Sequence, residues 1–103
     1  MIVIRNVFRL KFGKAREAIA ILKDGMEIQK RVAATAGAQM SSRLLSDVTG
    51  PFYTLVLELT VPSLAAFEQH APAMMGDKEF QANYQKVLPL IEEGSREIFS
   101  IVG

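Results

Sequence analysis

Residues Phe52–Val61 alternate in a pattern that predicts a β-strand with one apolar face and one mixed face. The apolar face carries Tyr53, Leu55, Leu57, Leu59 and Val61. The mixed face carries Phe52, Thr54, Val56, Glu58 and Thr60, with one carboxylate among them. A strand covered on one face alternates, whereas a strand covered on both faces approaches a continuous apolar run. This strand lies between the two cases, so we expect a central strand whose leucine face meets helices.

Three further segments have the period of two that is typical of strands. They are Ile2–Phe12, Gln39–Val48 and Arg96–Val102. The turn at residues 47–51 contains Gly50 and Pro51 and joins the second of these segments to the central strand as a hairpin.

Helical spacing of apolar residues predicts one long helix over Lys14–Ala36. Gly25 lies inside this helix, where glycine costs about 1 kcal/mol relative to alanine, so we expect close packing or a bend there. Ser63 is a good N-cap for a short helix, Leu64–Ala71, which we expect to be interrupted at Pro72.

The last predicted helix begins after Asp77, which can cap it, and continues through the stripe of apolar residues to Glu93. Pro89 removes a backbone donor and is expected to kink this helix near its end. The last strand then follows at Arg96.

The order strand, helix, strand, strand, helical pair, strand is the βαββαβ pattern of ferredoxin-like domains. The expected fold class is therefore α+β, with a four-stranded antiparallel sheet and the helices on one face. If Phe52, Val56, Ile98 and Val102 point to the other face, they form an apolar patch that would be exposed in a single chain. Such patches mark interfaces or ligand clefts. We expect a symmetric homodimer through the sheet face, with a shared, enclosed interior.

Composition excludes several classes of function for this single domain of 103 residues. Twelve basic and eleven acidic side chains give a net charge of +1, which provides no electrostatic surface for nucleic acid or an anionic membrane. The chain has no cysteine and one histidine, His70, so thiolate sites and sites with two imidazoles from one chain are excluded. Apolar runs are shorter than the ~18 residues of a spanning helix, and the expected location is the cytoplasm.

Several segments, in this order and spacing, resemble NIPSNAP-like domains of the dimeric α/β-barrel superfamily. They are Leu10–Lys14 (with Phe12 in place of a proline), Gly50–Pro51, Ser63–Leu64, Asp77–Gln81, Lys86–Ile91 and Glu97–Ile98. The resemblance implies one NIPSNAP-like domain over residues 1–103 and a homodimeric barrel. The superfamily also includes cofactor-independent antibiotic-biosynthesis monooxygenases and heme-degrading monooxygenases, while NIPSNAP-like domains have no settled activity. The aromatic residues that such families place late in the third strand are replaced here by leucines and a valine.

Asn6 is an amide on an otherwise apolar strand face. The resemblance relates it to an asparagine of heme-degrading relatives, which also use a tryptophan in the third strand and a histidine at the position of Tyr84. Because both of those residues are missing, heme degradation is disfavoured, and we expect no cofactor and no metal. The alternative for Asn6 is a hydrogen-bonded polar residue that lines the dimer interior.

Glu58 and His70 are the candidate catalytic residues. Glu58 would act as a general base on a phenol or enol if it faced a cleft; the alternative is an ion pair with Arg5, Arg9 or Arg43. His70 is the second candidate because imidazole side chains are common general acids and bases, and the alternative is a partly exposed surface histidine.

The candidate ligand-binding residues are Asn6, Phe8, Met74 and Tyr84. Met74 would act with Met75 as an adaptable cover over an apolar ligand, unless both simply pack the helix connection. We expect the chain to bind a small apolar or aromatic molecule in a cleft between sheet and helices. The two alternatives are a cofactor-independent monooxygenase of the antibiotic-biosynthesis type and a structural dimer without a ligand.

Overall fold

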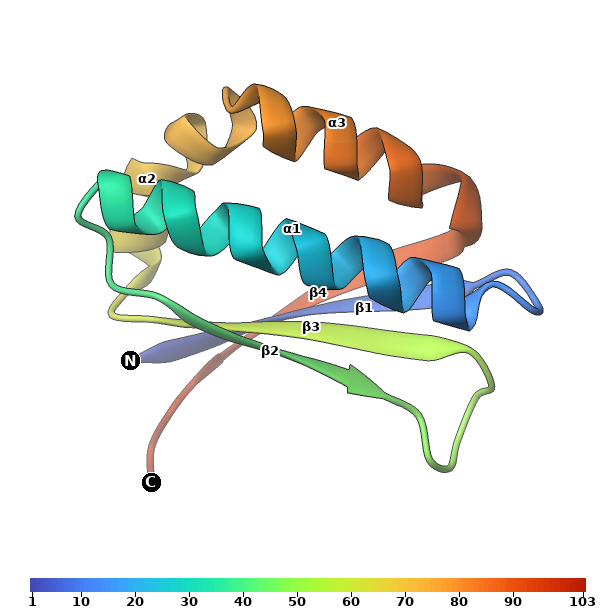
Figure 1. Cartoon of the computed structure of the whole chain (residues 1–103). Coiled ribbons are helices and arrows are strands. Elements are labelled where there is room, and N and C mark those ends of the chain that lie inside the picture. The colour runs from blue at the N-terminus through green and yellow to red at the C-terminus, as the bar shows by residue number, and fades with distance from the viewer.

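Four antiparallel strands form one sheet in the order β2-β3-β1-β4. They are β1 (Ile2–Leu10), β2 (Ser41–Ser46), β3 (Thr54–Val61) and β4 (Ile91–Ser100). Three helices, α1 (Ala15–Thr35), α2 (Leu64–Met75) and α3 (Lys78–Val87), lie on one face of the sheet, and a short 3₁₀ helix, η1 (Leu88–Leu90), leads into β4 (Figure 1). This computed structural model describes all 103 residues. The predicted α+β ferredoxin-like fold is confirmed.

The leucine face of β3 meets the helices, as its alternation predicted. Leu55, Leu57, Leu59 and Val61 are all buried. The register pairs Leu59 with Ile4 and Leu55 with Phe8 of β1, so the apolar face continues onto the neighbouring strand. The strand begins two residues later than predicted, because Tyr53 adopts a left-handed backbone conformation with φ of 61°.

The predicted end of the second helix at Pro72 is wrong, because α2 continues through the proline to Met75. Pro72 removes one helical donor and its ring crowds the preceding turn, but its fixed φ is helical, so the backbone can continue at some cost in stability. The next turn is hydrogen bonded, since the Gly76 amide donates to the Pro72 carbonyl at 3.0 Å. Ser63 caps the helix as predicted, with its Oγ accepting from the Ala66 amide.

The predicted extension of the last helix to Glu93 is also wrong. The α-helix ends at Val87, Pro89 lies in the 3₁₀ turn, and β4 already begins at Ile91. Pro89 cannot donate within a helix, and the tight turn lets the chain reverse and pair with β1. The register of that pairing places Ile98 opposite Ile4, on the helix side of the sheet, and not in the predicted patch with Val56.

The apolar residues of the other sheet face, the open face, differ in part from those predicted. Val56 is there, and its register partners are Val7 and Leu45. Phe99 takes the place expected for Ile98, because it pairs with Val3. Phe52 lies in the turn before β3, and Val102 follows the end of β4.

Gly25 lets α1 approach α3 closely. A Cβ at this position would lie 2.6 Å from Asn83 Oδ1, and Asn83 Nδ2 donates to the Ile21 carbonyl at 2.9 Å. The expectation of close packing at this glycine is confirmed.

This contact predicts a reversal of sign in a double-mutant cycle. Gly25→Ala alone will lower the free energy of unfolding by about 1 kcal/mol, because Asn83 must move and loses its hydrogen bond. In an Asn83→Ala background the same substitution will raise the free energy of unfolding by about 1 kcal/mol, through helix propensity. Urea denaturation of the four proteins measures both effects, and equal effects in the two backgrounds would contradict the contact.

Candidate functional site

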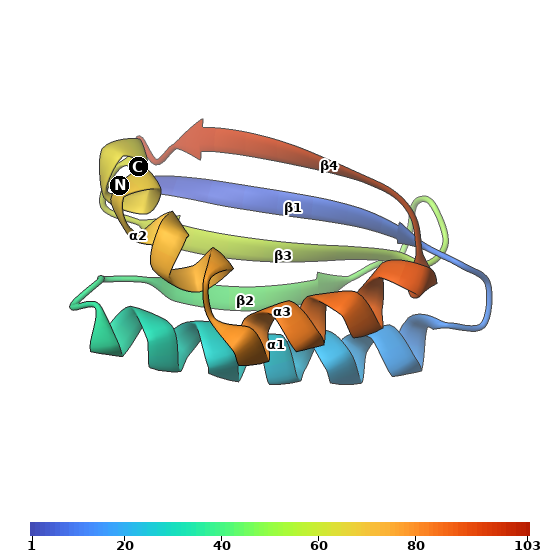
Figure 2. The same ribbon diagram turned by 90° about the horizontal axis from the view of Figure 1, so that it is seen from above.

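A cleft of about 660 Å³ lies between the sheet and the helices. Thirty residues line it, and 20 of them are hydrophobic. They come from all three helices, from β1, β3 and β4, from the connection between α1 and β2, and from Pro62 and Leu88. Two features of the layers leave this space open. No residue of α2 is buried, and every residue of β4 after Ile91 is exposed, so the helical layer does not cover that edge of the sheet (Figure 2).

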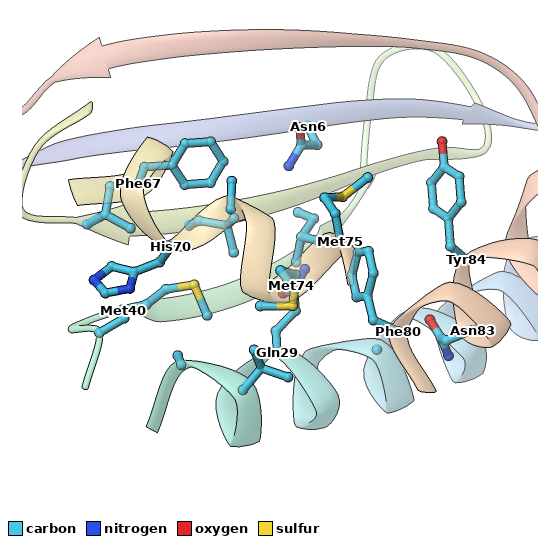
Figure 3. A pocket seen from close by; sticks show the side chains of 18 of the residues that line it. Asn6, Gln29, Met40, Phe67, His70, Met74, Met75, Phe80, Asn83 and Tyr84 are labelled. Carbon is cyan, nitrogen blue, oxygen red and sulfur yellow. The ribbon is translucent and has the colours of Figure 1, made fainter. Parts of the chain in front are cut away.

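Five of the six predicted site residues line this cleft. Asn6 and Phe8 reach it from β1, His70 and Met74 from α2, and Tyr84 from α3. Figure 3 shows Asn6 on the sheet side, with His70, Met74 and Tyr84 on the opposite, helical side. The structure thus brings together the predicted ligand-binding residues and one of the two predicted catalytic residues.

Glu58, the other predicted catalytic residue, lies on the open face of the sheet and does not line the cleft. Its carboxylate accepts from Arg5 Nη1 and from Arg43 Nε, each at 2.6 Å, and the residue is only 5% exposed. These are two of the ion pairs that the sequence offered as the alternative to a general base. Arg5 also lies 3.4 Å from Glu97 on the neighbouring strand. Glu58 and His70 therefore belong to opposite sides of the sheet within one chain.

Arg96 is the charged residue of the cleft, and sequence reasoning missed it. It faces Asn6 across the β1–β4 pairing, and its Nε donates to Asn6 Oδ1 at 2.8 Å. Its guanidinium carbon lies 5.9 Å from the centre of the Phe67 ring, within the range of a cation–π contact. Only the strand register brings Arg96 beside Asn6, and the sequence places it merely at the start of a strand.

The remaining polar side chains of the cleft come from the helices, apart from Gln39 in the connection between α1 and β2. Gln29 Oε1 of α1 is buried without a protein hydrogen-bond partner, while Asn83 is held by the Ile21 carbonyl. No group of three or more histidine or carboxylate side chains is placed to bind a metal ion. The cleft is thus an apolar space with a few polar side chains, an arrangement typical of small-molecule sites.

The helices beside the cleft are joined by an ion pair. Arg31 Nη2 of α1 donates to both carboxylate oxygens of Asp77, at 3.1 and 3.0 Å, and Asp77 Oδ1 also caps α3 by accepting from the Phe80 amide at 2.9 Å. The Phe80 amide, and after it Arg31, lower the pKa of Asp77 below its usual range. The bond to Asp77 raises the pKa of Arg31.

The pKa of Asp77 is lower in the folded protein than in the unfolded chain, so its negative charge stabilises the fold. This contribution is complete above the unfolded pKa of about 3.9. It is lost as the pH falls through the pKa of the folded protein. Asp77→Asn keeps a capping side chain but removes the charge. We expect the wild type to have a higher urea midpoint than Asp77→Asn at neutral pH. This difference in midpoint should disappear below about pH 4. A gap that stays constant down to about pH 2 would contradict this assignment.

Solved structures share this fold. An uncharacterized NIPSNAP domain protein from Burkholderia xenovorans superposes with a TM-score of 0.85 at 17% identity, covering 99% of this chain and 95% of that one. A NIPSNAP family protein of unknown function from Agrobacterium tumefaciens gives 0.82 at 23% identity, covering 96% and 86%. An antibiotic biosynthesis monooxygenase gives 0.74 at 13% identity, with 100% of both chains covered.

These likenesses confirm the predicted NIPSNAP-like fold and extend it to an antibiotic biosynthesis monooxygenase. No protein-family model and no curated protein matches the sequence. None of the helices is both long and apolar enough to cross a lipid bilayer.

Proposed function

We propose that this protein binds a small, largely apolar molecule in the cleft between its sheet and its helices. The observation that carries the proposal is the cleft itself, with about 660 Å³ of space and 20 hydrophobic residues among the 30 that line it. Small-molecule sites have volumes of roughly 300–1,000 Å³ and combine an apolar lining with a few polar groups that fix orientation.

Three methionines support an apolar ligand. Met40, Met74 and Met75 all line the cleft, and Figure 3 shows Met74 and Met75 on α2. Methionine side chains are flexible and polarisable, so they adapt to ligands of different shape. Helix α2, which carries Met74 and Met75, would then cover the bound ligand.

Native mass spectrometry tests the binding proposal even though the ligand is unidentified. The purified protein is incubated with an organic extract of cells, and one small molecule per chain is expected to stay bound. A cleft that remains empty after this exposure, and with simple apolar probes, would contradict the proposal and favour a structural role.

A second candidate function is cofactor-independent oxygenation of an acidic aromatic molecule. It is favoured by the position of His70 in the cleft and by the fold shared with an antibiotic biosynthesis monooxygenase. His70 would remove a proton, and the carbanion would react with dioxygen; one oxygen atom becomes a ketone and the other leaves as water, with the electrons supplied by the substrate. Oxygen consumption that is unchanged by His70→Ala would rule out this role of His70.

The open face of the sheet supports a homodimer. Its centre carries Val7, Leu45 and Val56 side by side, and the half-exposed Phe99 lies at its edge. A second copy of the chain would cover these apolar side chains and enclose the Glu58 ion pairs. Sedimentation equilibrium should give twice the chain mass.

A charge at the centre of this face tests the same assembly. Val56→Lys should give a monomer, because it would bury an unpaired ammonium in the dimer interface. Val48→Lys, in an exposed turn, is the matched control and should leave the dimer intact. A monomeric wild type would contradict the proposed assembly.

A further inference from the structure

The wall of the cleft formed by β1 and β4 presents hydrogen-bond donors and no free side-chain acceptor. Asn6 Oδ1 is occupied by Arg96 Nε, and this bond fixes the orientation of the amide, so that Nδ2 is left as a donor. Figure 3 shows the Asn6 amide nitrogen directed toward the helices, into the cleft. The two terminal nitrogens of Arg96 carry four more donors, and no protein side chain accepts from them.

The charge of Arg96 is also without a protein counterion. Arg5, Arg31 and Arg43 each pair with a carboxylate, whereas Arg96 forms no such pair. Among the residues that line the cleft there is no aspartate, glutamate or lysine, and Arg96 is the one permanently charged group. A guanidinium with both terminal nitrogens free matches a carboxylate in a bidentate arrangement.

The position of Arg96 also separates the polar and apolar parts of a ligand. Arg96 is exposed on the edge strand, while the space behind it is lined by the leucines and valine of β3 and by the aromatic and methionine side chains of the helices. An anionic group bound at this opening would keep contact with water, so its desolvation cost would be small. The apolar body of the same molecule would fill the cleft.

We propose, building on the ligand-binding function above, that the ligand of this cleft is a hydrophobic carboxylate whose anionic end is bound by Arg96 and Asn6. Asn6 has two tasks in this arrangement: its oxygen positions the guanidinium, and its Nδ2 donates to the ligand. A straight-chain acid and a flat aromatic acid share this chemistry. Which of them binds more tightly depends on how its apolar part fits the cleft.

The test compares acids with neutral analogues at neutral pH by isothermal titration calorimetry. The probes are decanoate against decan-1-ol, and 1-naphthoate against 1-naphthalenemethanol. We expect the wild type to bind at least one acid about tenfold or more tightly than its alcohol, as charge-assisted hydrogen bonds predict. The better acid identifies whether the body is a chain or a ring system.

Arg96→Gln should weaken binding of that acid about tenfold or more and leave the alcohol unchanged. Arg16→Gln is the matched control, because it removes the same charge from an exposed helix position outside the cleft. Asn6→Asp is a second variant, which should form an internal ion pair with Arg96 and block the acid while the alcohol still binds. Thermal unfolding of each variant verifies that it is folded.

The outcomes separate this inference from the function on which it rests. If the wild type and Arg96→Gln each bind acids as tightly as alcohols, the proposal of a hydrophobic carboxylate is wrong, while the proposal of an apolar binding site stands. If the folded wild type binds neither acids nor alcohols, both the anion and the proposed site fail.

Discussion

Glu58→Gln will lower the free energy of unfolding by about 2 kcal/mol without changing ligand affinity in the cleft. The carboxylate is buried and accepts two short bonds, from Arg5 and Arg43. Breaking a buried pair costs roughly 3–5 kcal/mol, and a smaller loss applies within the single chain, because the Arg5 and Arg43 side chains are partly exposed there. Urea denaturation measures the loss, and calorimetry with a cleft ligand measures the affinity.

Glu97→Gln is the matched control for this variant. Glu97 lies near the same Arg5, but at 3.4 Å and with a half-exposed side chain. An exposed pair of this kind contributes about 0–1 kcal/mol, so the control should be nearly as stable as the wild type. If Glu58→Gln were as stable as the control, the ion pairs of Glu58 would not stabilise the fold. If Glu58→Gln lowered the affinity for the ligand, Glu58 would take part in the site after all.

Ala71→Trp will weaken ligand binding in the cleft by at least about tenfold, or about 1.4 kcal/mol. Ala71 of α2 lines the cleft, and an indole at this position would occupy space that a ligand needs. The stability should change little, because α2 contributes no buried residue to the core. Calorimetry with the tightest probe gives the affinity, and urea denaturation gives the stability.

Ala73→Trp provides a control with the same substitution in the same helix. Ala73 is exposed and does not line the cleft, because two residues along a helix lead to the opposite side. It should bind the probe like the wild type. An equal loss of probe affinity in Ala71→Trp and Ala73→Trp would mean that α2 as a whole, and not the space in front of Ala71, determines binding.

Alternation along β3 was enough to predict its place in the fold. Leu55, Leu57 and Leu59 alternate with polar or smaller residues, which requires that Glu58 and the leucines lie on opposite faces of the sheet. The sequence did not determine which face borders the cleft. The structure places the leucines there, and Glu58 on the open face between two arginines.

The candidate site could be predicted only in part, for reasons of register and turn geometry. Asn6 was found because an amide on an apolar strand face is unusual. Arg96 was missed because its contact with Asn6 depends on the pairing of β1 with β4, 90 residues apart in the chain. The same pairing places Ile98 on the helix side and not on the predicted face. A shift of one residue in register reverses the face of every side chain in a strand.

The two faces of the sheet have different chemistry, and this difference organises the functional account. The helix side encloses the cleft, with Arg96 and Asn6 on one wall and His70 on the other. The open side carries the Glu58 ion pairs and the valines expected to meet a second chain. A ligand and a partner subunit would therefore use opposite faces of one sheet, with β3 and β1 in contact with both.

The five methionines provide the most direct test of the central claim, that this cleft binds a small apolar molecule. Met40, Met74 and Met75 line the cleft, whereas Met1 and Met26 do not. In a protein labelled with ¹³C at the methionine methyl groups, titration with the tightest acid or alcohol probe should shift the three cleft signals along one saturable curve. The signals of Met1 and Met26 should stay in place. Unchanged cleft signals at probe saturation, or shifts confined to the other two methionines, would contradict the account.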